Sequence, residues 1–168
     1  MKNLKKTDNQ KQWTVNDSAA LYGIDAWGSP YFSINTQGHI NISPTGEKGK
    51  GLDLLELIKE LGSRNLNFPL LIRFDDILED RVKQLHNAFE EAISKYHYQG
   101  KYQGVFPIKC NQQKHVVEEL MACGHHWHFG LEAGSKAELL IALALAKDPK
   151  AFLICNGYKD QRYIETTI

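Results

Sequence analysis

The sequence predicts an α/β protein with a parallel sheet covered by helices, preceded by a small β-rich segment. From Leu52 onward, short apolar runs alternate with segments of helical periodicity. Such alternation favours parallel strands that are buried on both faces. Four apolar runs begin near residues 70, 104, 127 and 151, and either an open doubly wound sheet or an eight-unit barrel accommodates them. Because an eight-unit barrel typically needs ~250 residues, the chain would hold about half of one.

The amino-terminal part differs in composition and in the pattern of its apolar residues. Residues 1–12 are polar and are expected to form a mobile tail. Two β-prone runs, Tyr31–Asn35 and His39–Ser43, flank a short loop that contains Gly38, which predicts a hairpin. Residues 43–51 collect one proline and three glycines and are typical of a linker. We therefore expect a tail over 1–12, a β-rich segment over 13–50 and a half-barrel over 51–168.

Each helix and strand of the second part follows from periodicity and flanking residues. Helical spacing of apolar side chains predicts helices over Leu54–Leu61, Leu78–Tyr96, Val116–Met121, Leu139–Ala146 and onward from Asp160. Apolar runs predict strands over Leu70–Phe74, Gly104–Ile108, Trp127–Leu131 and Ala151–Cys155. Ser135 and Glu138 precede the fourth helix at the spacing of a capping box.

Composition excludes several classes of function. Lysine plus arginine and aspartate plus glutamate each total 20, so the formal net charge is zero. A nucleic-acid-binding chain should be basic, and a chain without net charge is not steered to an anionic membrane. No apolar run approaches the ~20 residues of a membrane helix, and the basic start lacks the apolar stretch of a signal peptide. Three widely spaced cysteines argue against a disulfide framework and favour the reducing cytoplasm.

Lys109 is the leading candidate for chemistry. Reactive residues of parallel α/β proteins lie at the carboxyl ends of strands, and Lys109 closes an apolar strand. We expect its stem to be buried, and desolvation would favour the uncharged amine that forms a Schiff base with an aldehyde. Pro107 removes a ladder donor from the same strand, a local conflict typical of functional sites. The alternative is a lysine that merely snorkels from a strand end.

The remaining candidates each have a structural alternative. Glu132 either lines the same site or pairs with a lysine as a supporting carboxylate. Asn156 precedes Gly157 and is as plausible in a turn as in a pocket. His126 and His128 would share one face of a strand, but no further ligand follows at zinc spacing, so a metal pair is not favoured. Cys110 is expected to be a packed core cysteine.

Three segments carry a family resemblance. Val105–Gln113 (VFPIKCNQQ), Gly130–Leu139 (GLEAGSKAEL) and Leu153–Asp160 (LICNGYKD) resemble, in order, three blocks of the biosynthetic arginine decarboxylases. Trp13–Val15, Tyr22–Ile24 and Trp27-Gly28 are similar to the amino-terminal signature of that family. A wider resemblance, to ornithine and diaminopimelate decarboxylases, rests on Lys109–Asn111 and Ala133–Lys136.

The resemblance implies a pyridoxal-phosphate enzyme with an alanine-racemase-like barrel and a β domain to which residues 13–50 belong. It implies that Lys109 holds pyridoxal 5'-phosphate as a Schiff base, with Glu132 and Asn156 as candidate pocket residues. The implied reaction converts L-arginine to agmatine and carbon dioxide in putrescine and spermidine biosynthesis. The family also implies magnesium and a homo-oligomer.

Chain length qualifies that expectation. The family's chains are several times longer, so we expect this chain to be an amino-terminal part of such an enzyme and to be inactive alone. The phosphate loop, the acidic partner of the pyridine nitrogen and the substrate contacts would lie elsewhere. Two alternatives stay open: a shortened pyridoxal-phosphate carrier, and a non-enzymatic half-barrel that acts as a partner or decoy of a full-length decarboxylase.

Overall fold

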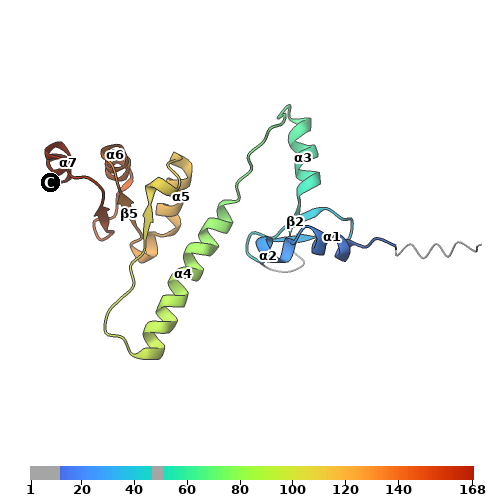
Figure 1. Ribbon diagram of the computed structural model, residues 1–168, viewed down its shortest axis with the longest axis horizontal. Helices are drawn as coiled ribbons and strands as arrows, with labels where there is room; N and C mark the ends of the chain where they lie inside the picture. The colour runs from blue at the N-terminus through green and yellow to red at the C-terminus, as the bar shows by residue number, and fades with distance from the viewer. Residues whose placement is uncertain (1–11, 47–50) are drawn as a thin grey trace, which may run out of the picture. The chain divides into compact units, whose positions relative to one another are not determined.

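The computed structural model describes residues 12–46 and 51–168. They divide between Ile72 and Arg73 into two compact units (Figure 1). The tail expected over 1–12 lies outside the described residues except for Gln12, and so do residues 47–50 of the expected linker. Within the described ranges, no helix combines the length and the apolar character needed to cross a membrane.

The first unit contains an antiparallel sheet in the order β1-β2-β3. Its elements are α1 (Val15–Leu21), α2 (Ile24–Gly28), β1 (Phe32–Ile34), β2 (Ile40–Ile42), β3 (Leu52–Asp53) and α3 (Leu54–Ser63). The predicted hairpin is confirmed, with Phe32 opposite Ile42 and Ile34 opposite Ile40. Gly38 takes a φ of 83° in its turn, a backbone conformation that favours glycine.

Asp53 joins the sheet of this unit to α3. One carboxylate oxygen caps the helix by accepting the N–H groups of Leu55 at 2.9 Å and Glu56 at 3.2 Å. The other oxygen accepts Asn35 Nδ2 at 2.7 Å and lies 2.8 Å from His39 Nδ1. Burial alone would raise the pKa of Asp53, but the hydrogen bonds, led by that of His39, lower it to about 2. The carboxylate therefore ties the hairpin turn to the start of α3.

The second unit contains a parallel sheet in the order β4-β5-β6. Its elements are α4 (Asp75–Tyr96), β4 (Val105–Pro107), the 3₁₀ turn η1 (Ile108–Cys110), α5 (Lys114–Cys123), the 3₁₀ turn η2 (His125–Trp127), β5 (Gly130–Ala133), α6 (Lys136–Leu145), β6 (Leu153–Cys155) and α7 (Gln161–Thr167). The predicted α/β class is confirmed, and the strands expected near 104 and 151 form, in shorter versions.

Two strand predictions are wrong. Leu70–Phe74 is irregular in the structure, with Leu71 largely exposed, because no strand that the structure describes lies beside this run to accept and donate ladder hydrogen bonds. The strand expected over Trp127–Leu131 begins instead at Gly130. His128 has a φ of 53°, which is incompatible with an extended strand at that point.

One core holds the sheet to its helices. Leu131 and Ala133 of β5 pack with Val117 of α5, Leu139 of α6 and Tyr163 of α7. Fully burying an aliphatic or aromatic side chain of this kind contributes about 1.5–3 kcal/mol. The helices α5, α6 and α7 therefore cover the face of β5 that bears Leu131 and Ala133.

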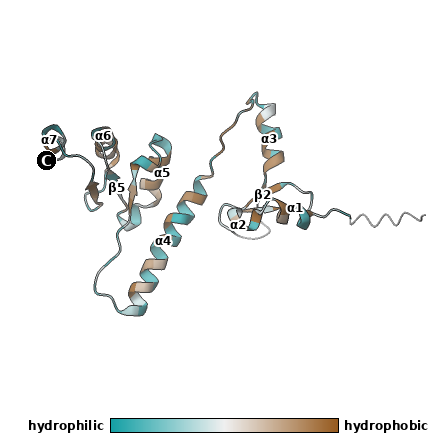
Figure 2. Ribbon diagram, in the orientation of Figure 1, coloured by the Kyte–Doolittle hydropathy of each residue, from teal (hydrophilic) through white to brown (hydrophobic). Residues whose placement is uncertain are grey.

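Figure 2 shows apolar and polar residues alternating along α4, as expected of a helix with one packed side.

The domain division expected from the sequence is not tested by this arrangement. β3 pairs with β2, and α3 packs on the same sheet, so residues 52–63 group with the amino-terminal unit. The assignment of residues 51–168 to half of a barrel stays a prediction.

The hydrogen bond between His39 and Asp53 predicts a measurable titration. Replacing His39 with glutamine should raise the pKa of the Asp53 carboxyl from about 2 toward its ordinary value of 3.8. Because the folded pKa lies below the unfolded one, Asp53 stabilises the unit above about pH 4 and loses this contribution as the pH falls toward 2. Carboxyl-detected NMR titration measures the shift, with the exposed His115→Gln as control. An unchanged Asp53 pKa in His39→Gln would contradict the assignment.

Candidate active site

The carboxyl ends of β4, β5 and β6 meet at one edge of the parallel sheet. Pro107, Glu132 and Ile154 are aligned across the three strands. The residues that follow the strands therefore emerge side by side, as in other parallel sheets whose ligands bind at this edge. Glu132 lies at this edge, and Lys109 and Asn156 follow the two strands beside it.

Lys109 lies in the 3₁₀ turn directly after β4. Ile108 is fully buried and anchors the turn, and its carbonyl accepts the N–H of Asn111 at 3.1 Å. The chain leaves the strand at Pro107, so Ile108 takes the buried position and Lys109 is exposed. The expected burial of the Lys109 stem is therefore wrong, and so is the expectation that Cys110 packs in the core, since Cys110 is exposed as well.

The lysines that follow the three strands differ in their partners. Lys136 Nζ lies 2.6 Å from a carboxylate oxygen of Asp160, the residue that caps α7. This hydrogen bond is the leading cause of the lowered pKa of Asp160. Lys159 Nζ donates to the carbonyl of Gly157 at 3.1 Å. Lys109 Nζ has neither a hydrogen bond nor an ion pair within the described part of the chain. Its amine is thus available to a ligand.

Glu132 places a buried carboxylate at the same edge. The residue is 7% exposed, and neither carboxylate oxygen has a hydrogen-bond partner among the described residues. The alternative in which a lysine pairs with Glu132 is therefore not realised in this structure. Since side chains alternate along a strand, Glu132 projects from the face opposite Leu131 and Ala133. A buried acceptor without a donor is costly unless another group completes it, which makes Glu132 a candidate ligand-binding residue.

Asn156 and Gly157 form the loop after β6. The Asn156 N–H extends the ladder to the carbonyl of Ala133 at 2.8 Å, and its Oδ1 accepts the Gly157 N–H at 2.9 Å. The side chain is exposed, and its Nδ2 donates to no other residue that the structure describes. Gly157 has a φ of 76°, and a Cβ there would lie 2.1 Å from the Gly134 carbonyl oxygen. Glycine is required where these two loops touch.

Two supporting residues were not identified as such from the sequence. Glu138 was assigned only to a capping box, and Ser135 Oγ does accept its N–H at 3.3 Å. The buried Glu138 carboxylate, however, accepts the Gly134 N–H at 2.7 Å and lies 3.4 Å from Gln112 Nε2. It thereby connects the loop after β5 with the loop that follows the Lys109 turn. Glutamate three residues after the cap was the available signal, but the sequence does not specify which N–H it reaches.

Tyr163 of α7 is the second such residue. Its hydroxyl donates to the carbonyl of Ala133 at 3.1 Å, and the side chain is almost completely buried. Burial, followed by the influence of Cys155 and of the carboxylates of Glu132 and Glu138, raises the pKa of Tyr163 to about 12. The neutral hydroxyl therefore fixes the carboxyl end of β5.

The histidine pair does not form the arrangement considered from the sequence. His126 lies in a 3₁₀ turn and His128 follows it, so the two do not share a strand face. His128 Nδ1 instead lies 2.6 Å from Asp148. Within residues 12–46 and 51–168, no three His, Cys, Asp or Glu side chains gather as a metal site would require.

The second unit is thus a parallel α/β domain that carries, at one sheet edge, a lysine amine and a buried carboxylate with no partner among the described residues. The family model of the pyridoxal-dependent decarboxylases, pyridoxal binding domain, matches residues 79–168. The chain belongs to this family.

Named relatives agree with that assignment. The chain is 70% identical over 162 residues to a biosynthetic arginine decarboxylase of Prochlorococcus marinus (strain MIT 9303), which covers 96% of this chain and 25% of the relative. It is 58% identical over 163 residues to that of Thermosynechococcus vestitus, covering 97% and 25%. The crystal structure of the biosynthetic arginine decarboxylase of Campylobacter jejuni aligns with a TM-score of 0.77 and 35% identity, covering 86% and 24%. The chain therefore spans about a quarter of the length of these relatives.

The contact between Gly157 and Gly134 makes a stability prediction. Gly157→Ala should destabilise the second unit by more than the ~1–2 kcal/mol of a left-handed alanine, because the new Cβ also meets a carbonyl oxygen. Gly38→Ala is the matched control, since Gly38 shares the positive φ but has open space around its Cβ position. Urea denaturation of each variant against the parent chain measures both effects. Equal losses in the two variants would show that the close approach contributes nothing.

Proposed function

We propose that this chain supplies the cofactor-lysine segment of a pyridoxal-phosphate-dependent arginine decarboxylase. The complete enzyme would convert L-arginine to agmatine and carbon dioxide in polyamine biosynthesis. The observation that carries the proposal is Lys109, whose amine, unlike those of Lys136 and Lys159, has no partner within the described residues. The family match over 79–168 and the names of the relatives support it.

The residues at the sheet edge fit pyridoxal 5'-phosphate. Lys109 offers the primary amine that an aldehyde requires. Glu132 offers a buried acceptor that lacks a donor, and Asn156 offers an amide N–H on the neighbouring loop. When bound, the cofactor supplies the electron sink that permits an amino acid to lose its carboxylate. The protein's part in this proposal is to orient: Glu138 and Tyr163 hold the loop after β5 against the Lys109 turn and α7.

The wider architecture is part of the same proposal. The sheet β4-β5-β6 would be part of an alanine-racemase-like (β/α)₈ barrel, with Glu132 on the inner face. Ile154, aligned with Glu132, and Phe152 are 43% and 52% exposed, as side chains awaiting further barrel layers would be. Residues 13–50 would belong to a β domain, and the enzyme would be a homo-oligomer of the cytoplasm. The three unpaired cysteines favour that compartment.

The chain alone is proposed to be inactive. It spans a quarter of its relatives, and a lysine with one carboxylate provides no cradle for the cofactor phosphate and no substrate contacts. The comparisons favour a decarboxylase and give no support to a shortened carrier or a decoy. A suitable test object is a chimera in which the chain replaces the matching segment of the Prochlorococcus marinus relative.

Borohydride reduction of the chimera with bound cofactor should attach the pyridoxyl mass to Lys109. Peptide mass mapping locates the label, and Lys109→Ala is the control that should abolish it. The amines of Lys136 and Lys159 are engaged and should stay unlabelled. A label on either of these lysines would refute the assignment of Lys109.

Agmatine formation by the chimera tests the reaction itself. Lys109→Arg should abolish turnover, because the guanidinium stays protonated and cannot replace the amine. Glu132→Gln should lower kcat by at least about tenfold, the value of one hydrogen bond to a charged acceptor. Lys83→Arg, on the exposed surface of α4, is the matched control and should retain activity. Full activity in Lys109→Arg would contradict the proposed function.

A further inference from the structure

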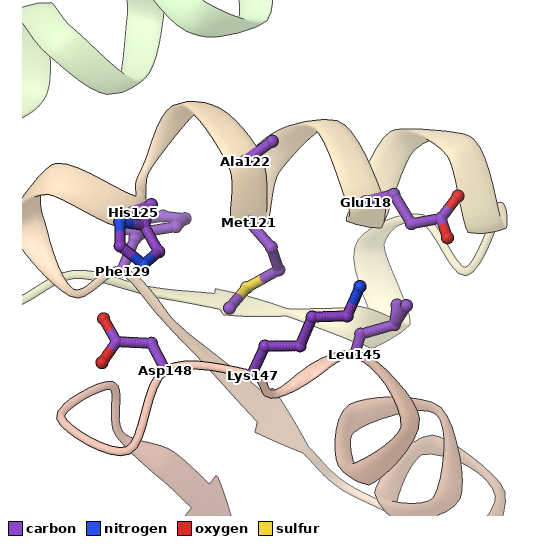
Figure 3. Close-up of a pocket in the computed structure, with 8 residues that line it drawn as sticks. All are labelled: Glu118, Met121, Ala122, His125, Phe129, Leu145, Lys147 and Asp148. Carbon is purple, nitrogen blue, oxygen red and sulfur yellow. The ribbon is translucent and has the colours of Figure 1, made fainter.

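A cavity lies at the other end of the same sheet. It has a volume of about 260 Å³ and an apolar wall formed by Met121, Ala122, Phe129 and Leu145 (Figure 3). Phe129 directly precedes β5, and Leu145 ends α6 on the way to β6. The cavity is therefore at the amino ends of the strands, whereas Lys109 follows the carboxyl end of β4. Its volume is below the ~300–1,000 Å³ typical for drug-sized ligands, so a smaller molecule fits.

Phe129, in the apolar wall of this cavity, is packed tightly by its neighbours. Phe129 is 6% exposed. Its ring packs so closely on Gly104 that a Cβ on that glycine would lie 2.5 Å from a ring carbon of Phe129. A Cβ on Gly124 would lie 2.4 Å from Phe129 Cβ. The ring of the buried His86 meets Phe129 edge-on at 5.5 Å. A wall that is packed before a ligand arrives reduces the entropy lost on binding.

Charged groups of opposite sign stand at the two ends of the cavity. Figure 3 shows Asp148 and His125 at one end and the amine of Lys147 at the other, with the Met121 side chain between them. Asp148 is fixed by His128 at 2.6 Å and by the Lys150 N–H at 2.9 Å. A carboxylate accepts about four hydrogen bonds, so Asp148 retains acceptor capacity.

The Lys147 amine has a charge that no described residue pairs with. It has no hydrogen bond or ion pair with any residue that the structure describes. Glu118 stands at the same end, where its carboxylate lies 3.7 Å from the amine of Lys114, so these three side chains together carry a net positive charge. The cavity therefore presents a net positive charge at one end, the Asp148 carboxylate at the other and an apolar wall between them.

We propose that this cavity binds an ω-amino carboxylic acid, an elongated zwitterion. Its carboxylate would meet Lys147, its ammonium would meet Asp148 with His125, and its methylene chain would lie on Met121, Phe129 and Leu145. An α-amino acid carries both charges on neighbouring atoms and matches only one end. The cavity shares no lining residue with the sheet edge that carries Lys109 and Glu132, so this proposal does not depend on the proposed decarboxylase activity.

Four six-carbon probes separate the contributions. The probes are 6-aminohexanoate, hexanoate, hexylamine and the α-zwitterion 2-aminohexanoate. Calorimetric titration of the 168-residue chain and of the chimera should give the tightest binding for 6-aminohexanoate. Each single-charge probe should bind about tenfold more weakly, because one charge-assisted hydrogen bond is lost.

Two variants test the location. Lys147→Met keeps the stem but removes the amine, and should bring 6-aminohexanoate down to the affinity of hexylamine. Ala122→Phe fills the cavity from an exposed helix position and should abolish binding without disturbing the core. Lys150→Met is the matched control, since only the backbone of Lys150 is used, and it should bind like the parent. Circular dichroism verifies the fold of each variant.

Several results would overturn this inference. These are an absence of saturable 6-aminohexanoate binding, equal affinity for hexanoate or 2-aminohexanoate, and undiminished binding in Lys147→Met or Ala122→Phe. Because the readout is binding, an inactive chimera that still binds 6-aminohexanoate would refute the decarboxylase proposal and leave this one intact.

Discussion

Strand β5 is hydrogen-bonded on both sides, and all four of its residues are buried. Its parallel ladders with β4 and β6 align Pro107, Glu132 and Ile154, which sets where each following loop emerges. A slip of one residue would turn Glu132 to the face of Leu131 and Ala133, against the apolar side chains of three helices. The position of every candidate site residue therefore depends on this register.

The loop after β5 is then fixed by contacts from three directions. Glu138 accepts the N–H of Gly134 from within α6, and Tyr163 donates to Ala133 from α7. Gly157 approaches Gly134 so closely that no side chain fits between them. These contacts leave the loop little freedom, whereas the amine of Lys109 and the carboxylate of Glu132 have no partner in the part of the chain that the structure describes. Rigid support around unsatisfied groups is the arrangement expected of a ligand-binding edge.

Polar side chains join the strands at both ends of the sheet. At the amino ends, Gln103 Nε2 donates to the carbonyls of His128 and Lys150, and Asp148 pairs with His128. These bonds join the starts of the strands without using an apolar side chain. At the carboxyl ends, the Glu138 carboxylate and the Tyr163 hydroxyl hold the loop after β5. Polar side chains therefore hold the strands at both ends of the sheet, whereas the buried carboxylate of Glu132, which has no donor among the described residues, lies at the carboxyl ends.

The sequence by itself determined the α/β class, the hairpin and the candidates Lys109, Glu132 and Asn156, because periodicity and motif spacing are local properties. Only the tertiary structure decided that Leu70–Phe74 is not a strand, since a strand requires a neighbour with which to pair. It also decided that Ile108 is buried in place of Lys109 and that Glu138 reaches the Gly134 N–H. Burial and partner choice depend on residues distant in the chain, and local patterns do not encode them.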